Sequence, residues 1–297
     1  MVQELKNPKI GSTCLSMQVT ITMLKQRIVT AVILAVLFVT AMTLISAPVF
    51  STLVMLAIMF AGWEWSGLTK INSGRARAVF MLTLLAVLLV ANHQLDVYGD
   101  FDQQLSYQIC LFALVLWAIC FLWIQGYPSS TILWGRSLVI ASIGLMFLLA
   151  TWIALTAIIL FDNGKWLLLL AIIVVVLADV GGFFAGKLFG RHKLAPIISP
   201  GKTWEGFVGG LVLQLALILG LTLYLPEVAI IDIAVLVIPV ALLSVVGDLF
   251  ESMLKRHSGV KDSGSLLPGH GGVLDRLDGV MAALPMFWVL LFQGSVF

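Results

Sequence analysis

The sequence predicts an all-α polytopic membrane protein with about nine transmembrane helices. Of its 297 residues, 61% are hydrophobic and only 11% are charged, whereas a soluble domain carries about 25% charged residues. The apolar residues form long runs, among them 28–46, 167–177 and 229–246, and runs approaching about 20 residues are typical of membrane-spanning helices. The basic residues also fall almost entirely on alternate loops between the runs.

Turn-forming residues such as Pro48, Gly99, Pro128 and Pro226 separate the apolar runs. The fifth run is long enough to tilt or to contain a break. The spans predicted in this way are 28–47, 50–65, 78–92, 107–124, 137–160, 166–185, 206–225, 228–247 and 279–295.

The distribution of charge predicts the orientation, because cytoplasmic loops of membrane proteins are enriched in Lys and Arg. With the N-terminus in the cytoplasm, every Lys and Arg except Lys165 falls on the cytoplasmic side, and the external loops carry Asp and Glu. We therefore expect a cytoplasmic N-terminus, a periplasmic C-terminus and a cytoplasm-facing active site in a bacterial inner membrane. The net charge of +2 is no sign of nucleic acid binding, and no nucleic acid partner is expected.

Three regions differ in composition. Residues 1–22 are polar and lack the apolar core of a secretory signal, so we expect a dispensable N-terminal extension before Met23. Residues 23–160 carry few groups capable of chemistry and are expected to form a scaffold and a dimer contact. Residues 161–297 contain nearly all the candidate groups and are expected to form the catalytic domain.

Glu64 is the one candidate group in the amino-terminal half. Trp63 and Trp65 flank it, and tryptophan at the end of a span is more often an interface anchor. The cysteines show no metal-ligand spacing, so we expect them to be packing residues; they are Cys14, Cys110 and Cys120.

The first unusual cytoplasmic segment, within residues 178–210, begins with Asp179 near the end of an apolar run. A carboxylate inside a membrane is costly, so Asp179 needs either a cationic partner or a water-filled site. A salt bridge to Lys187 or Arg191 would satisfy it without implying a function. The nearby glycines could simply allow close helix packing; they are Gly181, Gly182 and Gly186.

The same segment contains the string Ser199-Pro200-Gly201-Lys202-Thr203. Ser as N-cap and Pro at the first helical position predict a helix start, with Lys202 and Thr203 in a first turn that could bind an anion. The string is not a P-loop, because Pro196 stands where that motif requires a glycine and no strand is expected before it. Phosphate binding would depend on basic residues that also satisfy the positive-inside rule, namely Lys187, Arg191, Lys193 and Lys202.

The second segment, residues 248–278, concentrates charge around a glycine-rich turn. Asp248, Ser252 and Lys255 are spaced to lie on one face of a helix. Asp275 and Asp278 are three residues apart and also share a face, although Asp275 could be merely the N-cap of the last span.

The turn Gly269-His270-Gly271-Gly272 allows a ligand to approach the backbone closely. Two carboxylate sites, Asp248 and the Asp275 and Asp278 pair, could flank one metal ion or two. Mg²⁺ binds through few carboxylates together with phosphate oxygens and water, and two-metal sites support in-line displacement at phosphorus. The histidines are too scattered for a zinc site.

The string SMLKRHSGVKDSGSLLPGHGGVLDRLD, residues 252–278, resembles the signature of the phosphatidate cytidylyltransferases, also called CDP-diacylglycerol synthases. The resemblance extends upstream to the strings GDLFES at 247–252, KLFGRHKLAP at 187–196 and SPGKTW at 199–204. In all it covers residues 178–280.

This resemblance implies that CTP and phosphatidic acid react to give CDP-diacylglycerol and pyrophosphate, with Mg²⁺ at one or two metal sites, one of which could be monovalent. It also implies a multi-helix membrane fold, commonly a homodimer, whose polar cavity faces the cytoplasm and opens to membrane lipid. The family's paired metal aspartates correspond to Asp248 and Asp275. The chain departs from the family at Val180, where a small hydroxyl residue is usual.

Three sets of site residues are predicted. The catalytic residues are Asp248, Asp275, Asp278, Lys255, Arg256, Lys261 and His270. The substrate-binding residues are Lys187, Lys202, Thr203, Ser252, Gly271, Gly272 and Arg276. The metal ligands are Asp248, Asp275 and Asp179.

Three other functions remain open or are disfavoured. A CTP-dependent lipid kinase would share the membrane, nucleotide and metal, but would release CDP. A CDP-alcohol phosphotransferase is disfavoured because its pattern of aspartates is absent. A transporter is disfavoured because the polar residues cluster at one face of the membrane and not at mid-depth.

Overall fold

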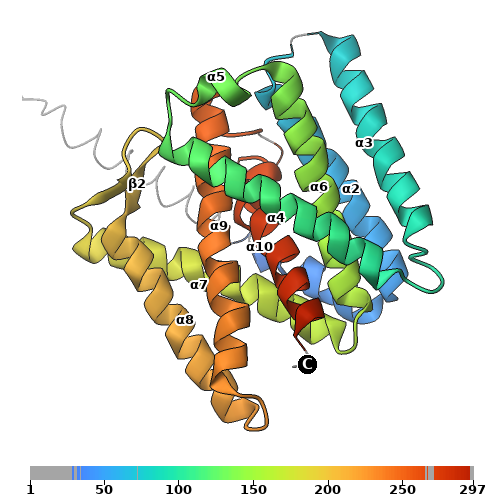
Figure 1. Ribbon diagram of the computed structural model, residues 1–297, viewed down its shortest axis with the longest axis vertical. Helices are drawn as coiled ribbons and strands as arrows, with labels where there is room; N and C mark the ends of the chain where they lie inside the picture. Colours follow the sequence, from blue (N-terminus) through green and yellow to red (C-terminus); the bar gives the residue numbers. More distant parts are fainter. Residues whose placement is uncertain are drawn as a thin grey trace, which may run out of the picture.

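The computed structural model describes residues 29, 32, 33, 35–71, 73–264, 266 and 271–294. Within these residues the chain forms a bundle of long helices with one short β-hairpin at its side (Figure 1). The predicted extension at 1–22 and the predicted catalytic residue His270 lie outside the described residues.

The helical elements follow one another with short connections. They are an apolar helix at Ala35–Leu44, α2 (Ala47–Leu68), α3 (Gly74–Gln94), α4 (Gln103–Gln125), α5 (Thr131–Trp134), α6 (Ser137–Leu160), α7 (Gly164–Phe189), α8 (Trp204–Tyr224), α9 (Ile230–Ser258) and α10 (Leu274–Gln293). The hairpin between α7 and α8 consists of β1 (Lys193–Ala195) and β2 (Ser199–Thr203).

The predicted membrane character is confirmed in its essentials. Seven helices among the described residues are long and apolar enough to cross a bilayer, and each corresponds to a predicted span: α2, α3, α4, α6, α7, α8 and α9. The first predicted span corresponds to the shorter Ala35–Leu44 helix, and the ninth corresponds to α10. The count of nine and the orientation stay predictions.

The helix start predicted at Ser199-Pro200 is wrong. These residues begin β2, which pairs antiparallel with β1 so that Lys193 lies opposite Thr203. Helix α8 begins only at Trp204, with Thr203 as its N-cap. The Thr203 hydroxyl accepts a hydrogen bond from the Gly206 N–H at 3.1 Å. Thr203 is therefore both the last residue of β2 and the N-cap of α8. Pro200 is tolerated because each strand of a two-stranded hairpin is an edge strand.

Helix α9 is longer than the predicted span 228–247. It runs through Pro239 to Ser258 and ends at Gly259, whose φ of 74° is the left-handed conformation that favours glycine at a helix C-terminus. The charged residues from Asp248 to His257 therefore continue the membrane helix, and Lys261 and Asp262 lie on the loop that follows it.

Aromatic side chains hold the middle of the bundle together. Trp117 of α4 stacks on Phe147 of α6 with ring centroids 3.9 Å apart, and Phe250 of α9 packs edge-on against both rings. The indole N–H of Trp65 on α2 donates to the Ile140 carbonyl of α6 at 3.0 Å. Because Trp65 and Phe250 are almost fully buried, α2 and α9 have fixed positions relative to each other.

Helices α7 and α8 approach each other through glycines. A Cβ atom placed on Gly181 would lie 2.6 Å from the Gly209 carbonyl oxygen, and one placed on Gly206 would lie 2.6 Å from the Gly182 carbonyl oxygen. Small residues at these positions let the two backbones touch, as in membrane helix pairs generally. The alternative that Gly181, Gly182 and Gly186 serve helix packing is confirmed.

Replacing Gly181 by alanine is expected to destabilise the α7–α8 pair, because its Cβ would overlap backbone that cannot move aside. The free energy of unfolding should fall by about 1–3 kcal/mol, the usual cost of overpacking. Gly220→Ala on α8 is the matched control, since nothing lies within 4 Å of a Cβ there. Denaturant unfolding in detergent would check this, and equal effects of the two substitutions would contradict it.

Candidate functional site

A cavity of about 440 Å³ opens between α7, α8, α9 and the hairpin. Its walls are largely apolar, with Phe183 and Phe207 among the lining residues. Charged side chains also reach it, namely Asp179, Lys187, Lys202 and Asp248. The cavity therefore presents apolar and charged surfaces to a single ligand, as an amphiphilic molecule requires.

An ion pair crosses this cavity from the hairpin to α9. Lys202 Nζ lies 2.5 Å from Asp248 Oδ2, and both side chains are about three-quarters buried. The Ser252 hydroxyl, one turn further along α9, donates to Asp248 Oδ1 at 3.3 Å. Three predicted site residues are thus brought together. Of the predicted helical face, Asp248 and Ser252 are in contact, whereas Lys255 pairs with Glu251 and Asp275.

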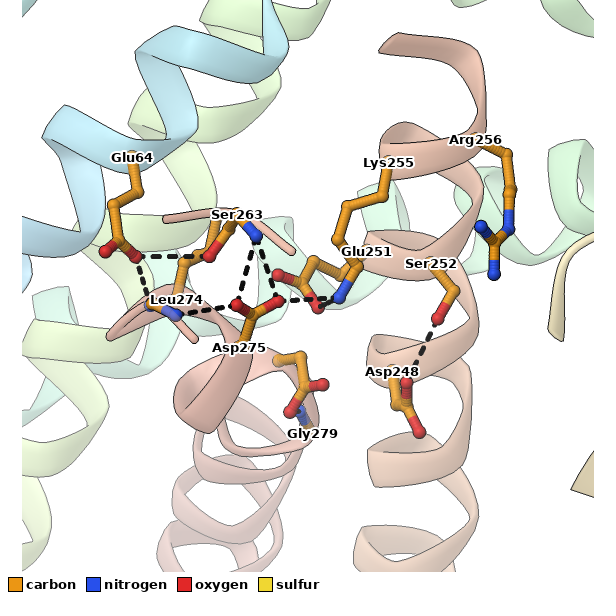
Figure 2. Close-up of polar contacts among 12 residues, drawn as sticks. Glu64, Asp248, Glu251, Ser252, Lys255, Arg256, Ser263, Leu274, Asp275 and Gly279 are labelled. Atoms are coloured by element: carbon orange, nitrogen blue, oxygen red, sulfur yellow. Dashed lines mark hydrogen bonds and ion pairs between the residues drawn. The ribbon is translucent and has the colours of Figure 1, made fainter. Parts of the chain in front are cut away.

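A second charged cluster lies where α9 meets the start of α10. Lys255 Nζ is 2.7 Å from Asp275 Oδ1 and 2.7 Å from Glu251 Oε2. Figure 2 shows Lys255 directed away from α9 and toward Asp275, at the top of α10. Glu251 is fully buried and Asp275 is nearly so, so Lys255 neutralises two carboxylates inside the protein.

Backbone groups complete the environment of Asp275. Its carboxylate accepts hydrogen bonds from the Ser263 N–H at 3.0 Å and from the Gly272 N–H at 2.8 Å. Gly271 has a φ of 84°, which a side chain would strain, and a Cβ there would also lie 2.7 Å from Asp275 Oδ2. At Gly271 and Gly272 the backbone therefore lies close to the Asp275 carboxylate, and the approach of a ligand to this turn stays a prediction.

The two clusters are joined electrostatically through Asp278. Gly247 of α9 packs directly against the Asp278 carbonyl of α10, which brings the two helices together at this level. Asp278 lies close enough to Asp248, Glu251 and Asp179 for their charges to interact. Its carboxylate accepts a hydrogen bond from the Gly279 N–H at 2.8 Å.

Carboxylates outnumber cations around this point. The acidic side chains are Asp179, Asp248, Glu251, Asp275 and Asp278, and the nearby cations are Lys202, Lys255 and Arg276. In addition, Glu251 Oε1 is buried without a hydrogen-bond partner among the described residues. Excess negative charge and an unsatisfied oxygen suit a hard cation with oxygen ligands.

No three acidic, histidine or cysteine side chains of the described residues form a ready-made metal cage. Mg²⁺ is usually held by one or two carboxylates and completed by phosphate oxygens and water. The residues present therefore fit a magnesium ion that binds together with a phosphate-bearing substrate.

The remaining predicted basic residues have distinct positions. Arg256 Nε donates to the Ile198 carbonyl at 3.1 Å and so ties the hairpin to α9. Lys187 lies 5.8 Å above the Phe183 ring at the cavity wall. Arg276 lies close enough to Asp179 for their charges to interact, and Lys261 is exposed on the loop before α10.

Two alternatives for individual aspartates can now be compared with the structure. Asp179 forms no ion pair with Lys187 or Arg191 among the described contacts; instead it faces the cavity. Asp275 is not the N-cap of α10, because Val273 occupies that position. Asp275 does accept a hydrogen bond from the nearby Gly272 N–H, but its ion pair with Lys255 goes beyond a capping role.

Sequence reasoning missed Glu205 and Glu251, and it identified Glu64 as a candidate group without its contacts. Glu251 holds Lys255, Glu205 accepts hydrogen bonds from the Arg191 and His192 N–H groups, and Glu64 reaches the loop before α10. A charged residue within an apolar run was the only available signal for Glu64 and Glu251.

Val180 does not line the cavity among the described residues, and 38% of its surface is exposed. The neighbouring Asp179 faces the cavity, so the two side chains diverge as successive helical positions must. Val180→Ser is therefore expected to change the turnover rate by less than about twofold, because surface substitutions away from functional features usually have effects within about 0.5 kcal/mol. A gain of tenfold or more in a steady-state assay would contradict this.

Known proteins similar to this chain are cytidylyltransferases, and the similarity extends over most of its length. The sequence profile of the cytidylyltransferase family matches residues 25–293. A phosphatidate cytidylyltransferase of Pseudomonas aeruginosa is 39% identical over 279 residues, which cover 92% of this chain and 98% of the relative. The phosphatidate cytidylyltransferase of Haemophilus influenzae is 36% identical, covering 89% of this chain and 97% of the relative. That of Staphylococcus saprophyticus is 46% identical over 133 residues, covering 44% of this chain and 51% of the relative.

Proposed function

Since this chain belongs to the cytidylyltransferase family, we propose that it transfers the cytidylyl group of CTP to phosphatidate, giving CDP-diacylglycerol and pyrophosphate for phospholipid biosynthesis. The observation that carries the proposal is the similarity, over nearly the whole length of both chains, to two proteins named phosphatidate cytidylyltransferase. The geometry supports it, because cationic and acidic side chains gather beside a largely apolar cavity.

Phosphatidate would occupy the cavity between α7, α8 and α9. Its acyl chains would lie along the apolar wall that includes Phe183 and Phe207, and its phosphate would replace Asp248 as the partner of Lys202. The lipid would enter sideways from the inner leaflet, since its acyl chains need never leave the membrane.

CTP would bind next to the cavity, toward the loop that precedes α10, with its α-phosphorus facing the phosphate of the lipid. Lys261, Gly271 and Gly272 belong to this loop, and Lys255 lies beside it. Cationic side chains and backbone N–H groups are the usual ligands of phosphates; the Gly272 N–H, which now donates to Asp275, would have to exchange that partner for a phosphate oxygen. His270 is proposed to contact the same phosphates.

The reaction requires alignment more than proton transfer. A phosphatidate oxygen would form a bond to the α-phosphorus of CTP, and the bond from that phosphorus to the bridging oxygen of pyrophosphate would break, with the electron pair leaving on pyrophosphate. The attacking oxygen is already an anion, so no strong general base is needed. Lys202 and Lys255 would orient the two phosphates and offset their repulsion.

Mg²⁺ would draw negative charge from the reacting phosphates when bound. Asp248 and Asp275 would hold it, with Asp278 and Asp179 in support. A second site, which could be monovalent, would use the same carboxylates. The lysines now paired with Asp248 and Asp275 would then be available to the phosphates.

The membrane arrangement belongs to the same proposal. Nine spans, a cytoplasmic N-terminus and a periplasmic C-terminus would place the site at the cytoplasmic face of a bacterial inner membrane. Figure 1 is consistent with this, since the hairpin and the C-terminal end of α9 lie at one end of the bundle, and the C-terminus lies toward the other. The protein would act as a homodimer through residues 23–160, and residues 1–22 would be dispensable.

The test is an assay of purified protein in detergent micelles with α-labelled CTP, Mg²⁺ and phosphatidic acid. We expect label to enter the lipid phase only when phosphatidic acid and Mg²⁺ are both present. Label that stays in water as CDP would identify a CTP-dependent kinase instead. A lack of turnover by well-folded protein would count against the enzyme, and flux measurements in vesicles would then test the transporter alternative.

A further inference from the structure

Glu64 lies far from the signature in sequence but is in direct contact with it. It belongs to α2, in the amino-terminal half, and only 6% of its surface is exposed. Its Oε2 atom accepts hydrogen bonds from the Leu274 N–H at 2.8 Å and from the Ser263 hydroxyl at 3.2 Å. Both donors flank the loop that enters α10, as Figure 2 shows.

The contact with Leu274 supplies a helix cap that α10 lacks. The N-cap residue is Val273, whose side chain has no acceptor, and it makes no capping hydrogen bond. The first N–H groups of a helix have no partner within the helix, and a negative charge near them is favourable. Glu64 therefore caps α10 from a different helix.

The loop is shaped around the Glu64 carboxylate. A Cβ atom on Gly264 would collide with Oε1, and one on Gly272 would collide with Oε2. At Gly264 and Gly272 the lack of a side chain thus allows the backbone to lie close to one carboxylate. Glu64 Oε1 itself is buried without a hydrogen-bond partner among the described residues, and burying a polar atom without a partner is costly.

Glu64 and Asp275 hold the same loop from two sides. The Ser263 side chain donates to Glu64, and the Ser263 N–H donates to Asp275. Asp275 in turn pairs with Lys255, which pairs with Glu251. A continuous chain of hydrogen bonds therefore runs from α2 to the charged cluster, through Ser263 (Figure 2).

Glu64 is itself held firmly. The next residue, Trp65, is fully buried and bonded to the Ile140 carbonyl of α6. One turn of α2 is also tied to α3, because Arg77 donates to the Ser66 hydroxyl at 3.0 Å and to the Trp63 carbonyl at 3.2 Å. These contacts hold this turn of α2 in place, and with it the Glu64 carboxylate that binds the loop.

We infer that Glu64 is a positioning residue for the nucleotide side of the site: it fixes the loop carrying Gly271 and Gly272, and through it the orientation of Asp275. This rests on the proposed function in assigning CTP to that loop. The lipid side, where Lys202 and Asp248 meet in the cavity, makes no described contact with Glu64. Glu64 should therefore affect the two substrates unequally.

Glu64→Gln keeps the shape and an acceptor but removes the charge. We expect KM for CTP to rise about tenfold, the usual effect of losing a charge-assisted hydrogen bond, while KM for phosphatidate stays within about twofold. Hydrogen–deuterium exchange of the amides of Ser263, Gly272 and Leu274 should also quicken about tenfold. Glu227→Gln is the matched control, since Glu227 is exposed on the α8–α9 connection.

The two measurements separate this inference from the proposed function. Faster exchange in Glu64→Gln, found while the wild-type protein transfers no cytidylyl group, would support the fixation of the loop and reject the reaction. Unchanged exchange together with unchanged KM for CTP would overturn the inference, as would an equal rise of both KM values. If Glu64→Gln fails to fold, Ser263→Ala removes one of the two hydrogen bonds from the loop side, and the same substrate-selective effect is expected.

Discussion

Asp248→Asn and Asp275→Asn are each expected to reduce cytidylyl transfer to near background while the protein still folds and inserts. The loss should be on the order of 10²–10³-fold or more, as when one preorganised electrostatic contact to a reacting group is removed. Each substitution keeps the size of the side chain, so Lys202 and Lys255 retain a neighbour of the same shape. The measurement is initial rate against Mg²⁺ concentration in micelles.

Asp232→Asn provides the control for Asp248→Asn, because it makes the same change in the first turn of the same helix, α9. It should leave the rate near the wild-type value. Near-normal rates for both Asp248→Asn and Asp275→Asn would refute the assignment of these carboxylates to the metal. A rate that recovers only at high Mg²⁺ would point directly to weakened metal binding.

Lys255→Met is expected to have the largest effect on stability. Lys255 is the shared partner of Glu251, which is fully buried, and of Asp275, which is nearly so. Removing one partner of a buried ion pair leaves an uncompensated charge and typically costs about 3–5 kcal/mol. The free energy of unfolding in detergent should fall by this amount, and turnover should be lost with it.

A second substitution separates the two consequences. Adding Glu251→Leu to Lys255→Met removes the unpaired buried charge, so it should recover part of the stability but none of the activity. Lys165→Met is the control for loss of a lysine, because Lys165 is exposed and its ammonium donates to the Thr43 carbonyl. A Lys255→Met protein as stable as wild type would show that Glu251 and Asp275 do not depend on this charge.

The sequence was informative wherever a local pattern determined the structure. The apolar runs predicted the membrane helices, and the i, i+4 spacing placed Ser252 beside Asp248. The Ser199-Pro200 pair was misleading, because its capping preference was outweighed by pairing of β2 with β1 and by Thr203 as a better-placed cap. The predicted span ended at residue 247 because its apolar run ends there, although the spacing of Asp248, Ser252 and Lys255 already indicated that a helix continues.

The roles of Glu64 and Glu251 could not be predicted, because they depend on contacts distant in the chain. Glu64 meets Ser263 and Leu274 across 199 and 210 residues. Glu251 belongs to the string GDLFES at 247–252, which resembles the family signature. Its burial depends on how α9 and α10 pack. A single sequence gives the residue type of such groups but not their partners.

The length of α9 determines the depth at which the chemistry takes place. Its 29 residues span about 43 Å at about 1.5 Å per residue, compared with a hydrocarbon core of about 30 Å. If α9 crosses the bilayer upright from Ile230, about 20 residues traverse the hydrocarbon, so Asp248 comes close to the opposite boundary of the hydrocarbon. A phospholipid in that leaflet already carries its phosphate at this level, so the substrate need only diffuse in the plane of the membrane to reach the site, and the product can leave along the same plane.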